Sequence, residues 1–63
     1  MNEQQKGEKP MNFITYEITV YGSTGHLVHR EYRKLESYHA AEIVGRESVR
    51  WLGGDHYEIR AIK

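Results

Sequence analysis

The sequence predicts a small α+β domain of the β-β-α-β type, with one helix packed on one face of a three-stranded antiparallel sheet. Residues 13–21 and 56–62 alternate between apolar and polar side chains, which is typical of strands. Residues 38–52 instead repeat small and apolar side chains at helical spacing. A chain of 63 residues has room for one such domain, which we assign to residues 13–63.

Residues 1–12, MNEQQKGEKPMN, are polar and contain the only proline, so we expect a disordered leader. They lack the apolar segment of a secretory signal. No later run approaches the roughly 18 apolar residues of a membrane helix. The chain also has no cysteine. We therefore expect a cytoplasmic protein with no membrane partner.

The first strand, residues 13–21, is expected to contribute one face to the core of the domain. Its apolar face consists of Ile14, Tyr16, Ile18 and Val20. Gly22-Ser23-Thr24-Gly25 then supplies a turn, because glycine accepts the positive φ of tight loops. The turn joins this strand to residues 26–35 as a hairpin.

The second strand, residues 26–35, has two interpretations. Either Leu27 and Leu35 point into the core, or Val28 and Tyr32 do. We adopt the second, with a bulge near Leu35. This phase leaves three polar side chains on the bare face of the sheet: His29, Glu31 and Arg33. The basic residues of the segment indicate an edge strand, since such charges block unwanted pairing.

The helix is expected to begin after Ser37, which can cap it, and to end at Gly53, a natural left-handed residue. Gly45 on its inner side suggests a close approach of helix and sheet. The predicted inner side, with the tryptophan in the core, comprises Ala40, Ala41, Val44, Gly45, Ser48, Trp51 and Leu52.

The last strand, residues 56–62, is expected to point Tyr57, Ile59 and Ala61 toward the helix. A helical crossover from the second strand brings it beside the first. The predicted strand order is therefore 2-1-3, which gives the most hydrophobic strand the central position.

Composition argues against several functions. Nine basic and nine acidic residues cancel, which argues against a dedicated DNA-binding protein and against an acidic DNA mimic. Four histidines without cysteine do not supply the converging ligands of a zinc site. No activated nucleophile, carboxylate pair or phosphate-binding glycine loop is recognisable. We expect no enzymatic activity, no metal and no cofactor.

Residues 13–63 resemble small phage-encoded β-β-α-β proteins, such as phage inhibitors of bacterial RNA polymerase. The resemblance rests on length, a leader, the helix SYHAAEIVGRESVRWLGG after a charged strand, and the last strand HYEIRAIK. It implies a non-enzymatic protein that binds a host enzyme in the host cytoplasm. It also implies contact through charged residues of the sheet edge, among which Arg33 or Arg60 would serve here.

Three hypotheses follow. The first is a regulator or inhibitor that binds a host protein such as RNA polymerase, through the bare face and charged edge of the sheet. The contact residues would be Tyr21, Arg30, Glu31, Arg33 and Arg60. The second is a nucleic-acid-binding module that uses the basic and aromatic residues of the second strand. The third is a structural homodimer that pairs bare faces or edges.

Overall fold

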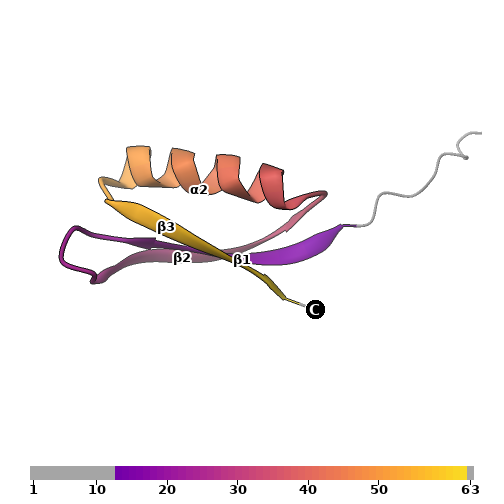
Figure 1. The fold of residues 1–63 in the computed structure, drawn as a ribbon, viewed down its shortest axis with the longest axis horizontal. Helices are drawn as coiled ribbons and strands as arrows, with labels where there is room; N and C mark the ends of the chain where they lie inside the picture. Colours follow the sequence, from indigo (N-terminus) through magenta and orange to yellow (C-terminus); the bar gives the residue numbers. More distant parts are fainter. Residues whose placement is uncertain (1–12, 63) are drawn as a thin grey trace, which may run out of the picture.

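The computed structural model describes residues 13–62, and the predicted leader lies outside them. The chain forms β1 (Ile14–Tyr21), β2 (Leu27–Leu35), α2 (Tyr38–Leu52) and β3 (His56–Ile62). The strands make one antiparallel sheet in the order β2-β1-β3, and α2 covers one face of it (Figure 1). The predicted α+β fold and strand order are confirmed.

The core forms where β1 meets the helix. Ile18 and Val20 are completely buried, Tyr16 is nearly so, and Ala41 of α2 packs against them. β3 pairs with β1 so that Ile59 lies opposite Ile18. The predicted apolar faces of both strands therefore point toward the helix.

The predicted phase of β2 is wrong. Leu35 pairs with Ile14 and packs against the core. Because side chains alternate along a strand, residues 33, 31 and 29 also face the helix. Glu31 consequently lies opposite the buried Ile18, while Tyr32 lies on the open face and is 60% exposed.

The bulge of β2 also lies at the other end from the one predicted. The register with β1 shifts between Val20 and Tyr21, where Val28 is passed over. Leu27 therefore lies on the opposite face from the other odd-numbered residues of β2, and it is exposed. A single extra residue reverses the alternation of a strand, and the sequence carries no mark of its position.

Both predicted ends of α2 are confirmed. The Ser37 hydroxyl accepts a hydrogen bond of 3.0 Å from the backbone N–H of Ala40. At the other end Gly53 adopts φ 73°, and the next N–H donates to the carbonyl of Val49. This fifteen-residue helix is too short and too polar to cross a membrane.

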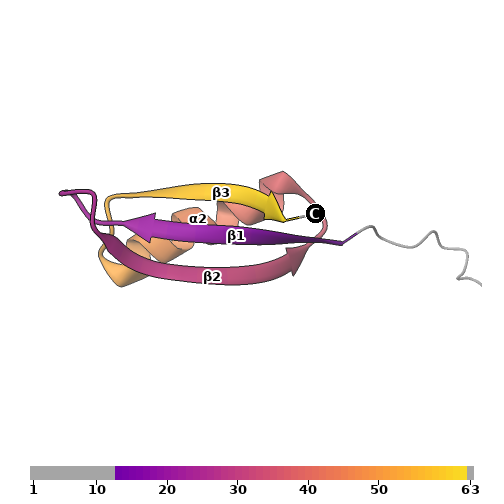
Figure 2. The same cartoon turned by 90° about the horizontal axis from the view of Figure 1, so that it is seen from below.

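Trp51 does not join the core, contrary to the prediction. Ala41 and Gly45 face the sheet, and Trp51 lies about 120° around the helix from Gly45 at 3.6 residues per turn. Figure 2 shows the last turn of α2 emerging beyond β2, where no further layer could cover it. Trp51 is consequently 77% exposed.

Gly45 provides a test of how closely α2 approaches β3. A Cβ at Gly45 would lie 2.7 Å from Cδ1 of Tyr57, near the base of the ring. Gly45→Ala should therefore lower the free energy of unfolding by about 1–2 kcal/mol, because overpacking outweighs the gain in helix propensity. Chemical unfolding followed by circular dichroism would measure it. In a Tyr57→Ala background the same change should be neutral or stabilising, and equal losses in both backgrounds would contradict the close approach.

Candidate partner-binding groove

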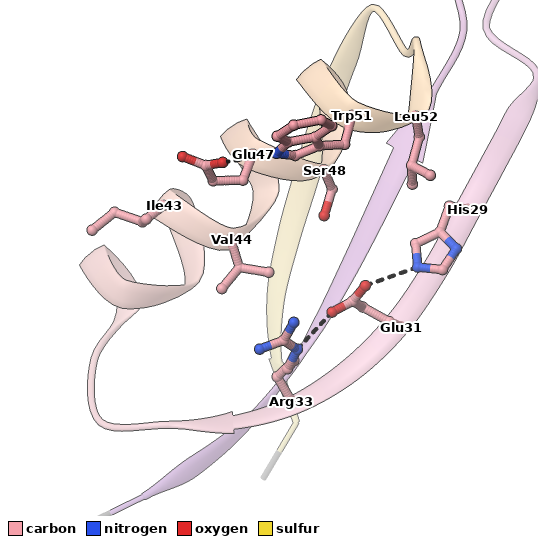
Figure 3. A pocket seen from close by; sticks show the side chains of 9 residues that line it. All are labelled: His29, Glu31, Arg33, Ile43, Val44, Glu47, Ser48, Trp51 and Leu52. Carbon is pink, nitrogen blue, oxygen red and sulfur yellow. Dashed lines mark hydrogen bonds and ion pairs between the residues drawn. The ribbon is translucent and has the colours of Figure 1, made fainter.

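A groove of about 450 Å³ lies between α2 and the core-facing side of β2 (Figure 3). It exists because the helix packs on β1 and β3 and leaves part of β2 uncovered. We call it the α2–β2 groove. Its lining residues are His29, Glu31, Arg33, Ile43, Val44, Glu47, Ser48, Trp51 and Leu52.

The strand side of the groove carries three polar residues in a row. Nε2 of His29 lies 2.8 Å from one oxygen of Glu31, and Nε of Arg33 donates to the other at 2.7 Å. Burial by itself raises the pKa of Glu31. Hydrogen bonds from His29 and Arg33, together with their charges, outweigh burial and hold that pKa below its usual value.

The helix side of the groove is mostly apolar. Ile43 is 45% and Leu52 is 47% exposed, and the ring of Trp51 lies between them along the helix, next to Glu47 (Figure 3). The indole N–H of Trp51 donates to Oε1 of Glu47 at 3.2 Å, which holds the ring along the helix surface. A partner could cover these three side chains without any rearrangement of the fold.

The groove holds the residue types of a hydrolytic triad in Ser48, His29 and Glu31. His29 and Glu31 are two positions apart on one strand, and their hydrogen bond uses the Nε2 atom of the ring. Within residues 13–62, no side-chain hydrogen bond joins Ser48 to His29. The same part of the chain has no group of three metal-ligating side chains.

The five residues predicted to contact a partner fall on two different faces. Glu31 and Arg33 lie in the α2–β2 groove, whereas Tyr21, Arg30 and Arg60 lie on the open face of the sheet. Trp51 and Leu52, which were predicted to lie on the inner side of the helix, are 77% and 47% exposed. The four-residue spacing between Glu47 and Trp51 was the available signal, because it places the indole beside a charged side chain.

The open face is organised around Glu17, whose side chain is only 13% exposed. Arg60 contacts Oε1 through Nε and Nη2, each at 3.1 Å, and Arg30 lies 3.4 Å from Oε2. The Tyr32 hydroxyl donates to Oε2 at 3.1 Å. Two arginines thus more than offset the one carboxylate at the centre of this face.

The ion pairs of Glu31 predict a dependence of stability on pH. Because the pKa of Glu31 is lower in the folded chain, the group stabilises the fold above its ordinary pKa of about 4.5. This contribution is lost as the pH falls through the lowered folded-state pKa. Glu31→Gln should therefore cost about 1 kcal/mol or less at pH 7, as other partly exposed pairs do, and nothing in strong acid.

Urea unfolding of both chains at pH 7 and in strong acid would measure the difference. The exposed Glu36 offers the matched control Glu36→Gln, which should change stability little at either pH. An effect of Glu31→Gln that is independent of pH would mean that packing, and not charge, accounts for the loss.

Comparison with known proteins adds no relative, because no family model, curated protein or solved structure matches this chain. The resemblance to phage inhibitors of RNA polymerase therefore stays an expectation from the sequence. The binding properties of the domain have to be inferred from its own surfaces.

Proposed function

We propose that this protein is a small non-enzymatic regulator or inhibitor that binds another protein through the α2–β2 groove. The observation that carries the proposal is the 77% exposure of Trp51 beside a concave surface. Tryptophan and arginine dominate the binding energy of protein interfaces, most often next to pockets from which water is excluded. Trp51 and Arg33 occupy opposite sides of the same groove (Figure 3).

The chemistry of the groove is that of a protein interface. Ile43, Trp51 and Leu52 supply apolar surface, which a partner would remove from water at about 25 cal/mol per Å². Across from them Arg33 is about half exposed and retains N–H groups beyond the one that binds Glu31. Apolar side chains along the helix that face polar groups on the strand fit a protein surface better than a small polar substrate.

Bacterial RNA polymerase is the first partner to test, in the cytoplasm of a bacterial host. This choice rests on the resemblance of residues 13–63 to phage-encoded inhibitors of that enzyme. The immobilised protein would be incubated with bacterial lysate, with and without nuclease, and the retained proteins identified by mass spectrometry. A stoichiometric protein that survives nuclease would then be purified for binding measurements.

The variant Trp51→Ala should weaken binding of that purified partner at least about thirtyfold, because truncating an interface hot spot costs about 2 kcal/mol or more. Tyr32→Ala is the matched control, since Tyr32 is a similarly exposed aromatic residue on the open face. It should leave the dissociation constant unchanged in isothermal titration calorimetry. The reverse pattern would place the contact on the open face and contradict the groove.

Single-stranded nucleic acid bound to the open face is a second candidate function. Arg30, Tyr32 and Lys34 of β2 share this face with Arg60 of β3, and these three cations outnumber its two carboxylates, Glu17 and Glu58, while Glu31 points to the other side. Tyr21 and His56 stack on the same face with ring centroids 5.2 Å apart. Such combinations bind nucleotide bases and backbone without sequence preference.

Fluorescence anisotropy with a single-stranded RNA oligonucleotide would test this candidate. Contact of three cations with phosphate predicts a slope of roughly −2 for the logarithm of affinity against the logarithm of salt concentration. Tyr32→Ala should weaken binding and Trp51→Ala should not, the opposite of the pattern for the groove. Absence of binding at low salt would eliminate this candidate.

A further inference from the structure

We propose that two copies of this protein associate through the free edge of β3, joining their sheets into one continuous six-stranded sheet. β3 pairs with β1 on one side only, and within residues 13–62 no strand lies on its other side. The helix lies in a separate layer above the sheet (Figure 1). Backbone groups along such an edge are a template for another strand.

The side chains of β3 leave apolar surface at this edge. Tyr57, Ile59 and Ala61 point toward the helix but are only half-buried, whereas the β1 residues opposite them are almost completely buried. A strand added beside β3 would complete their burial beneath the helix layer. The incomplete core at this margin therefore favours an additional strand.

The charged side chains of β3 favour a second copy of this protein as the added strand, and they determine which residues pair. Glu58 and Arg60 flank Ile59 on the open face. Antiparallel pairing about a two-fold axis at Ile59 places Glu58 opposite Arg60 of the second copy. By the same symmetry, Arg60 lies opposite Glu58 of the second copy. Pairing centred on Glu58 or on Arg60 would instead oppose like charges, which is unfavourable. One register thus brings complementary charges together twice.

The other edge of the sheet is unsuited to the same association. β2 carries Arg30, Arg33 and Lys34. Antiparallel self-pairing centred on Glu31 would oppose two carboxylates, and self-pairing centred on Tyr32 would oppose Arg30 and Lys34 twice, which offsets its two Glu31–Arg33 pairs. Lysine and arginine along an edge discourage strand addition. The two edges of one small sheet therefore differ in the charge pattern that governs pairing, and only β3 offers a register that pairs opposite charges without also opposing like charges.

Sedimentation velocity from about 1 μM to about 1 mM should reveal a species of twice the 7.4 kDa chain mass that increases with concentration. Glu58→Arg should shift the population to monomer, because four positive charges would then meet at the interface. Lys34→Glu is the matched control. Like Glu58, Lys34 lies opposite a threonine of β1, but on the other edge, and the variant should dimerise as the original does.

A mixed experiment tests the register. Arg60→Glu alone should also be monomeric, yet Glu58→Arg mixed with Arg60→Glu should form a heterodimer, since each arginine then faces a glutamate. Arg60 also pairs with Glu17, so circular dichroism must first confirm that this variant folds. If it does not fold, Glu58→Arg and Lys34→Glu decide the question.

A protein that is monomeric throughout the concentration range would overturn the proposal, and so would a dimer that survives Glu58→Arg or that is lost in Lys34→Glu. The test is independent of the α2–β2 groove. Trp51→Ala should leave the dimer intact, and a dimer that depends on Trp51 would indicate association through the groove instead.

Discussion

A single fifteen-residue helix has to cover the core face of three strands, and the rest of the molecule follows from that constraint. At 1.5 Å per residue the helix is about 22 Å long, and its diameter of about 10 Å roughly matches the separation of the outer strands. A helix running diagonally across the sheet cannot cover both edges along their whole length. It packs on β1 and β3, where Gly45 admits the ring of Tyr57, and part of β2 stays open.

The uncovered part of β2 explains why polar residues occupy positions that face the helix. His29, Glu31 and Arg33 are the neighbours of buried β1 residues, yet they reach solvent through the α2–β2 groove and satisfy one another by ion pairs. A charged side chain in a closed core would carry a large desolvation cost. In this half-open position the cost is small, and the same opening leaves Trp51 and Leu52 at the surface.

The domain therefore presents three surfaces of different chemistry. The groove combines apolar helix residues with a polar strand, the open face centres on Glu17 between two arginines, and the β3 edge is free. The groove shares no defining residue with the other two surfaces, so a partner in the groove and a second copy at β3 could be accommodated together, whereas Arg60 belongs to both the open face and the β3 edge. Such an arrangement would present two grooves on the same side of one sheet.

The strands, the helix, its caps and the strand order could be read from the sequence, because they depend on local alternation, helical spacing and glycine positions. Ile14, Tyr16, Ile18 and Val20 mark the core face of β1 without ambiguity. The phase of β2 could not be read, because both of its faces mix apolar and charged residues. Only pairing with β1 selects Leu35 as the inward residue, and only the bulge at Val28 separates Leu27 from it. The exposure of Trp51 likewise depends on where the helix ends relative to the sheet, a relation between elements distant in sequence that the local spacing of Glu47 and Trp51 indicates only indirectly.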